Sequence, residues 1–342
     1  MTHLLKENDN NDFKTGVELI KQGGTVAFRT ETVYGLGASA INDDAVKRIF
    51  IAKSRPQTNP LIVHFYSLAH LQEYLKVPTE ILPLFKIKGA LTVVLPLDFA
   101  GDKRISQVVL AGQKTVACRI PSCPFTQKLI RACGVPIAAP SANTSTRPSP
   151  TRWQDVYDDL NKRIDAIFIG KQTNIGLEST VVLYNNKKLE ILRQGGILAR
   201  KLSKITKLPV EIIQHENSKL AKSPGTQFKH YSPSAPLEVI TETLTIESLK
   251  SKHTVILCRN QNKKLYKNLT CETTQVITLG NSAKQIQSNL FAAFREAEKL
   301  LNKMNEHSQD LIKPEQLIFI EQMPNTDAFA TINERITKAS TR

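Results

Sequence analysis

The sequence lacks the signatures of several large protein classes. Its 342 residues contain no Walker-type phosphate loop, no HExxH motif and no Gly-x-Ser-x-Gly elbow. These absences argue against P-loop NTPases, zinc proteases and serine hydrolases. No apolar run approaches the roughly 20 residues that a membrane helix needs, and the polar N-terminus lacks the apolar centre of a signal peptide. We therefore expect a cytoplasmic protein.

Cysteine and aromatic residues are also scarce. The five cysteines form no CxxC pair and show no metal-ligand spacing with histidine, so we expect reduced, mostly buried thiols. Aromatic residues make up 6% of the chain, and the RNA-recognition motifs that stack bases on aromatic rings are missing. The net charge of +15 fits either a generally basic surface or attraction to polyanions, and charge alone does not separate the two.

The length and the pattern of the chain predict two α/β domains. A chain of this length is expected to form about two domains of roughly 150 residues each. In the first two-thirds, strand-like runs and helical stretches alternate irregularly, which indicates a twisted mixed sheet with flanking helices. The expected strands are 25–28, 61–65, 91–95, 115–120, 135–139, 166–169, 180–183 and 190–192, and the expected helices are 14–22, 43–53, 125–133 and 153–160.

A break in the pattern separates the second domain. Residues 217–236 are rich in turn-forming residues and carry an aromatic-basic cluster, which is typical of a linker that folds over a site as a lid. Three buried strands at 254–258, 275–279 and 317–320 and helices at 282–304 and 326–338 follow. They predict a smaller Rossmann-like α/β domain without a GxGxxG fingerprint, so we infer no nucleotide site there. The predicted organisation is a catalytic domain at 12–216, a linker or lid at 217–236 and a C-terminal domain at 237–342.

Two clusters of polar residues fall where predicted elements end. Lys53 and Arg55 follow a helix; they suit a triphosphate clamp, although a helix-terminal cation also complements the helix dipole. Small residues lead into Ser141 and Asn143, where the backbone could approach a ligand closely or form only a polar turn.

Further candidates are isolated side chains on or beside apolar strands. Arg119 and Arg193 each end such a strand, and each either faces an anion or forms a salt bridge. His64 is either a ligand-binding or a core histidine. Glu178 could be a base, a metal ligand or a solvated turn acid, and Ser179 could bind substrate or only begin a strand.

Taken in order, these segments resemble the YrdC-like family. The shared segments are TETVYGLG, KSRP with NPL, SAN followed by RPSPT, and GLESTVV, and they span residues 12–214. The linker and the C-terminal unit are similar to those of the longer, two-domain members. The chain departs from the family pattern at several loop positions, among them Arg29 and Lys88, which both stand where the family usually has proline.

The resemblance implies a nucleotidyltransferase, a threonylcarbamoyl-AMP synthase. Such an enzyme condenses L-threonine, bicarbonate and ATP, with Mg²⁺, into threonylcarbamoyl-AMP and pyrophosphate. Partner proteins then transfer the threonylcarbamoyl group to tRNA, and the resemblance leaves open whether this chain itself contacts tRNA. No membrane contact is expected. Two alternatives are a non-catalytic basic RNA-binding protein and a carbamoyl-phosphate-using relative, for which the chain lacks both the length and the CxxC pairs.

The resemblance also assigns roles to individual residues. It implies that threonine is held by Thr32, His64, Ala139 and Ser179. It places the following residues around ATP: Lys53, Arg55, Asn59, Thr115, Arg119, Ser141, Asn143, Ser149, Arg193 and Tyr231. Lys53 and Arg55 are the expected catalytic residues, since the reaction needs positioning and charge neutralisation rather than a protein nucleophile.

Overall fold

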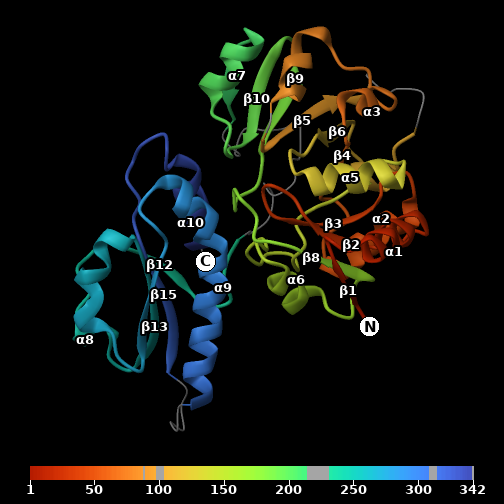
Figure 1. Cartoon of the computed structure of the whole chain (residues 1–342). Coiled ribbons are helices and arrows are strands. Elements are labelled where there is room, and N and C mark those ends of the chain that lie inside the picture. The colour runs from red at the N-terminus through yellow and green to blue at the C-terminus, as the bar shows by residue number, and fades with distance from the viewer. Residues whose placement is uncertain (88, 98–103, 214–230, 308–313, 341–342) are drawn as a thin grey trace. The chain divides into compact units, whose positions relative to one another are not determined.

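The computed structural model describes residues 1–87, 89–97, 104–213, 231–307 and 314–340. The chain forms two compact units (Figure 1), which are treated separately below. The first comprises Met1–Ser145 and Ser149–Phe228, and the second comprises Lys229–Arg342 together with the short segment Thr146–Pro148. Most of the predicted linker, including Phe228, Lys229 and His230, lies outside the described residues, as does Lys88.

The first unit is built on an 11-stranded mixed sheet, which confirms the predicted twisted mixed architecture. Its strand order is β1-β8-β2-β3-β7-β4-β6-β5-β9-β10-β11, with parallel and antiparallel neighbours. The strands are β1 (His3–Lys6), β2 (Val26–Arg29), β3 (Tyr34–Ser39), β4 (Ile62–His64), β5 (Leu91–Pro96), β6 (Thr115–Arg119), β7 (Ile137–Ala138), β8 (Ala166–Ile169), β9 (Thr180–Asn185), β10 (Lys188–Arg193) and β11 (Val210–Ile212).

Three strands of this sheet, β1, β3 and β11, were not predicted from the sequence. Residues 34–39, read from the sequence as a glycine kink, form strand β3, which pairs antiparallel with β2. Gly37 is required there because a Cβ atom would lie 2.4 Å from the Phe28 ring and 2.7 Å from Ile137. The glycine therefore lets an aromatic ring pack across the strand, and the polar residues 30–33 become the turn of a β-hairpin.

Helices cover the sheet and complete two cores. Phe13, Val17 and Ile20 of α1 and Leu129 and Ile130 of α5 pack with sheet residues in one cluster. A larger cluster contains α2, whose first turn is capped by the Asn42 side chain. The helices of this unit are α1 (Asn10–Lys21), α2 (Asp43–Lys53), α3 (Leu68–Gln72), the 3₁₀ helix η1 (Thr79–Lys86), α4 (Gln107–Leu110), α5 (Pro124–Cys133), α6 (Trp153–Leu160) and α7 (Ala199–Thr206).

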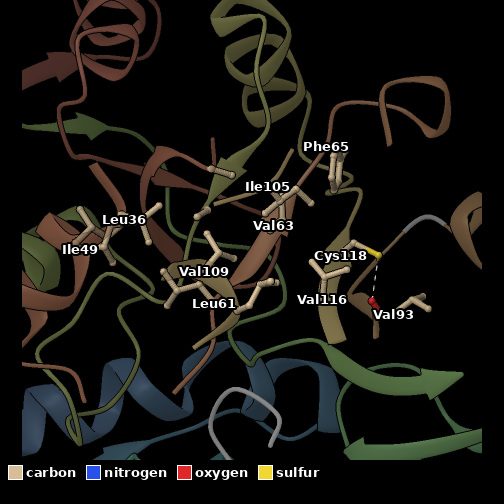
Figure 2. Packing of buried hydrophobic residues seen from close by; sticks show 14 of the residues in the cluster. Leu36, Ile49, Leu61, Val63, Phe65, Val93, Ile105, Val109, Val116 and Cys118 are labelled. Carbon is tan, nitrogen blue, oxygen red and sulfur yellow. Dashed lines mark hydrogen bonds between the residues drawn. The ribbon is translucent and has the colours of Figure 1, made fainter. Parts of the chain in front are cut away.

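Alternation along the central strands separates this core from a polar face. Val63 and Cys118 point into the larger core (Figure 2), where the Cys118 thiol donates to the Val93 carbonyl at 3.1 Å. Their neighbours along the strands, His64 and Arg119, therefore point to the opposite face. All five cysteines are free and four of them are buried, as expected from their spacing.

The second unit has a four-stranded parallel sheet of order β12-β15-β13-β14. Figure 1 shows α9 and α10 on one side of its strands and α8 on the other. Its elements are β12 (Leu237–Ile240), α8 (Ile246–Leu249), β13 (Lys252–Cys258), the 3₁₀ helix η4 (Asn260–Leu269), β14 (Thr274–Thr278), α9 (Ala283–His307), β15 (Glu315–Glu321) and α10 (Ala330–Ser340). Parallel strands with helices confirm the Rossmann-like prediction.

The carboxyl edge of this second sheet is filled by its own side chains. Glu321, at the end of β15, accepts hydrogen bonds from the Arg259 amide (2.7 Å), the Asn262 side chain (2.8 Å) and the Tyr266 hydroxyl (3.1 Å). Among the described residues of either unit, no helix is long and apolar enough to cross a membrane.

Candidate active site

The turn of the β2–β3 hairpin carries the first polar cluster. The Thr30 hydroxyl accepts hydrogen bonds from the amides of Thr32 (3.1 Å) and Val33 (3.3 Å) and lies 2.7 Å from the Val33 carbonyl. This hydroxyl-stabilised turn fixes Glu31 and Thr32, which are 7% and 0% exposed. The local sequence therefore presents a carboxylate and a hydroxyl inside the protein.

Arg119 joins this turn to the centre of the sheet. Its guanidinium lies 2.6 Å from Glu31 Oε1 and 3.0 Å from Thr32 Oγ1, and its side chain is 5% exposed. Burial alone would raise the pKa of Glu31, but the charge and hydrogen bond of Arg119 outweigh it and hold that pKa below its ordinary value. A buried ion pair of this kind is retained despite the cost of desolvating both charges.

His64 lies beside Arg119 because the strand register places it there. β4 and β6 run parallel, and His64 pairs with Arg119 directly. Burial, reinforced by the neighbouring Arg119 charge, lowers the pKa of His64 to about 3. The imidazole is therefore neutral at physiological pH and is available as a hydrogen-bonding group.

Ser179 extends the cluster across the sheet. Its hydroxyl lies 2.7 Å from the Thr92 hydroxyl of β5 and accepts a hydrogen bond from Arg193 at 3.2 Å. Arg193 also donates to the Ser179 carbonyl at 3.1 Å. Since Cys118 pairs with Val93, the residues next to them, Arg119 and Thr92, are neighbours on the polar face. Adjacent strands thus connect His64, Arg119 and Ser179.

Gly195 allows this close approach of segments. A Cβ atom there would lie 2.2 Å from the Thr180 amide nitrogen and 2.8 Å from the Glu178 carbonyl oxygen, both of them backbone atoms. We expect Gly195→Ala to displace the Ser179 turn, because overpacking shifts the backbone. The resemblance assigns Ser179 to L-threonine, so affinity for that amino acid should fall by at least about tenfold. Calorimetric titration with L-threonine measures this, with alanine at the exposed neighbour Gly196 as the control. Equal affinity in both variants would contradict the prediction.

The segment around residues 139–143 closes the site beside the hairpin. The Ala139 amide donates to the Ile62 carbonyl at 2.9 Å, and the amides of Leu36 and Ala142 bond to the neighbouring backbone at 2.9 and 2.8 Å. These bonds tie the segment to β3 and β4. Ser141 is half-buried, and Asn143 is 4% exposed.

The Lys53 side chain donates hydrogen bonds to the backbone of this segment. Its side chain is 1% exposed, and Nζ lies 2.5 Å from the Ser141 carbonyl oxygen and within hydrogen-bonding distance of the Asn143 carbonyl oxygen. The Ser145 amide also donates to the Lys53 carbonyl at 2.9 Å. The structure thus places the ammonium against backbone carbonyls, and its role in the triphosphate clamp expected from the sequence remains a prediction.

Arg55 likewise makes hydrogen bonds within its own loop. Its guanidinium donates to the carbonyls of Asn59 (3.2 Å) and Pro60 (3.0 Å). Asn59 is 2% exposed, and its side-chain carbonyl Oδ1 has no hydrogen-bond partner among the described residues. A buried amide oxygen of this kind suits a donor on a ligand.

Three further residues predicted to bind the nucleotide lie on different segments of the chain. Ser149 is 2% exposed, and its hydroxyl lies 2.5 Å from Glu178 Oε1. Thr115 begins β6, at the opposite end of the strand from Arg119. Tyr231 belongs to the second unit, where its ring stacks on Phe291 with centroids 5.3 Å apart. Their contact with ATP remains a prediction.

Two residues of these clusters were not assigned a role from the sequence: Glu31 pairs with Arg119, and Thr92 contacts Ser179. Glu178, for which the sequence left the roles of base, metal ligand and turn acid open, bonds to Ser149. Glu31 could have been found from its position between two threonines of the hairpin turn. Thr92 gives no such signal, because it stands in an otherwise apolar strand.

The hairpin turn, the buried ion pair and the polar strand ends define an α/β protein with a buried cluster of polar side chains. The Sua5/YciO/YrdC family model, described as telomere recombination, matches residues 18–195, and the model of the threonylcarbamoyl-AMP synthase C-terminal domain matches residues 197–341. The chain belongs to the Sua5/YciO/YrdC family, which confirms the resemblance found in the sequence.

Individual relatives match both parts of the chain. The threonylcarbamoyl-AMP synthase of Pyrococcus abyssi is 38% identical over 290 residues, covering 82% of this chain and 83% of its own. That of Bacillus subtilis is 43% identical over 245 residues, covering 70% of this chain and 69% of its own. A crystal structure of P. abyssi Sua5 complexed with L-threonine matches with a TM-score of 0.82 and 31% identity, over 99% of this chain and 97% of that one.

Proposed function

We propose that this protein is a threonylcarbamoyl-AMP synthase, a nucleotidyltransferase that acts on L-threonine, bicarbonate and ATP. The observation that carries the proposal is the buried cluster of Thr32, Glu31, Arg119 and His64. The cluster lies in a chain whose whole length matches the L-threonine-bound structure of P. abyssi Sua5. Hydroxyls, one cation and a neutral imidazole together suit a small zwitterion that carries a hydroxyl group.

In the proposed reaction the amino group of L-threonine and bicarbonate give a carbamate and water. A carbamate oxygen then attacks the α-phosphorus of ATP, the bond to the β-phosphate bridging oxygen breaks, and pyrophosphate leaves. The protein positions the two reactants and neutralises charge, since neither step requires a protein nucleophile. A carbamate is labile in water, so binding beside buried polar side chains would protect it.

The geometry favours a change in the role of Arg119. The sequence resemblance placed it beside ATP, but it contacts Thr32 and pairs in register with His64, both assigned to threonine. We therefore place Arg119 on the amino-acid side, where a guanidinium fits the threonine carboxylate. Ser179 and Ala139 complete that side.

The nucleotide side remains with the loops that carry Asn59, Ser141 and Ser149. Within the described ranges no group of three His, Cys, Asp or Glu side chains could hold a metal ion. Mg²⁺ enters the proposal with ATP, because it commonly keeps several waters and binds through substrate phosphates. Delivery of the product to a tRNA-modifying complex and a cytoplasmic location are further parts of the proposal.

The test is pyrophosphate release from purified protein supplied with ATP and Mg²⁺. We expect release only when L-threonine and bicarbonate are both present, with threonylcarbamoyl-AMP identified by mass spectrometry. Omitting either co-substrate is the control for simple ATP hydrolysis. If well-folded protein releases no pyrophosphate in response to threonine, the proposal fails, and RNA binding by this basic chain becomes the hypothesis to examine.

A further inference from the structure

Helix α9 of the second unit buries charged side chains on one face. Phe291, Arg295 and Glu298 follow one another at spacings of four and three residues, so they lie on one face of the helix. They are 0%, 3% and 4% exposed. Burying a guanidinium and a carboxylate costs free energy unless both are hydrogen-bonded, so their partners indicate what this face does.

Arg295 donates to a backbone carbonyl of the segment 146–148. Its Nε and one terminal nitrogen donate to the Pro148 oxygen at 3.1 and 2.5 Å. Three residues along the helix, Glu298 accepts from Arg147 at 2.8 Å. Thus both charged residues hold the short segment Thr146–Pro148, which belongs to the second unit although its neighbours in sequence belong to the first.

The same face of α9 also contacts residues 231–234, which belong to the described end of the predicted linker. Glu298 Oε1 accepts from the Ser234 hydroxyl at 2.7 Å and from the Ser234 amide. Tyr231 stacks on Phe291, and the Ser232 amide donates to the Thr146 carbonyl at 3.2 Å. One helix face therefore fixes two segments, each next to or containing a residue expected near ATP.

Ser149 immediately follows the held carbonyl. It lies between two prolines, which fix their own φ angles and restrict the residue that precedes each of them. The Pro150 carbonyl accepts from the Tyr34 amide at 2.8 Å, and the Ser149 hydroxyl lies 2.5 Å from Glu178. With Pro148 and Pro150 both held, Ser149 has little conformational freedom left.

We propose that Arg295 and Glu298 are positioning residues that set the geometry of the nucleotide-side loop through Thr146–Pro148. This inference rests on the proposed function, because it assigns the loop to ATP. The second unit then contributes to catalysis by orienting Ser149, without touching a substrate. Loss of either side chain should weaken the use of ATP and leave the use of L-threonine nearly unchanged.

The test compares Michaelis constants in Arg295→Met and in Arg147→Ala. For Arg295→Met we expect the KM for ATP to rise by about tenfold or more, as lost hydrogen bonds from a charged donor imply. The KM for L-threonine should stay within about twofold, and Arg295→Lys should recover part of the loss. Glu296→Ala, an exposed position on the same helix, is the matched control.

Arg147→Ala keeps the test decisive if Arg295→Met does not fold. The Arg147 side chain is 40% exposed, so its removal leaves the core of the unit intact, and a KM increase confined to ATP is again expected. Equal changes for both substrates, or none, in folded protein would overturn the inference. Failure of the wild-type chain to release pyrophosphate would instead overturn the proposed function. In that case, direct titration with ATP would still show whether the variants weaken ATP binding through the loop.

Discussion

Replacing Arg119 with methionine should lower threonine-dependent pyrophosphate release by about a hundredfold or more. The substitution removes the cation that contacts Thr32 and leaves Glu31 as a buried carboxylate without its partner. Truncating one member of a buried, hydrogen-bonded charge pair typically costs about 2–5 kcal/mol, which corresponds to such a factor. Initial rates at saturating ATP measure the effect, and Arg163→Met, at an exposed position, is the control.

The same variant should change how stability depends on pH. In the wild type the pKa of Glu31 is lowered, so its ion pair stabilises the fold above the ordinary carboxyl pKa. That contribution is lost as the pH falls through the lowered value. In Arg119→Met the lowering by the Arg119 charge is gone, and burial, the largest influence, is opposed only by the backbone hydrogen bonds of Glu31 and Ser122. We expect the pKa of Glu31 to rise, so the free energy of unfolding should increase as the pH is lowered from 7 towards about 4.5.

Chemical denaturation at several pH values measures this reversal. We expect Arg119→Met to be less stable than the wild type by about 3–5 kcal/mol at pH 7, because an unpaired buried charge remains. Adding Glu31→Gln to this variant should recover much of the loss and remove the reversed pH dependence. Parallel pH profiles for the wild type and Arg119→Met would show that the pair does not act as described.

Helices and strands with a clear apolar pattern or a capping side chain could be predicted from the sequence. Residues 43–53 form a helix because the Asn42 side chain caps it and acidic residues fill its first turn. The strands at 62–64, 115–119 and 252–258 follow from their apolar, β-branched runs. Helix α7 was not predicted, because its eight residues contain few apolar positions, two lysines and an arginine.

Contacts that depend on strand register could not be predicted in this way. His64 and Arg119 are 55 residues apart, and only the pairing of β4 with β6 makes them neighbours. The hairpin was missed because two glycines in a strand usually weaken it, whereas here the Phe28 ring fills the space above Gly37. Similarly, Arg295 looks solvent-exposed in a sequence pattern, since charged helix residues usually are.

The prediction for Lys53 follows from its unusual burial. Lys53→Met should reduce the free energy of unfolding by about 2–4 kcal/mol, because it leaves the carbonyls of Ser141 and Asn143 without their shared donor. Activity should fall by about a hundredfold, since the segment that carries Ser141 and Asn143 would lose its support. Pyrophosphate release and chemical denaturation measure the two effects. Lys47→Met, an exposed position on the same helix, is the control.

Hydrogen exchange separates two explanations for that loss of activity. If Lys53 acts by positioning, its removal should increase amide exchange across residues 141–145, including the Ser145 amide that bonds to the Lys53 carbonyl. If the ammonium instead contacts the phosphates of ATP directly, activity should fall while exchange in this segment stays at the wild-type rate. The short contacts to two carbonyls favour the first outcome. Unchanged exchange together with an increased KM for ATP would restore Lys53 to the phosphate clamp expected from the sequence.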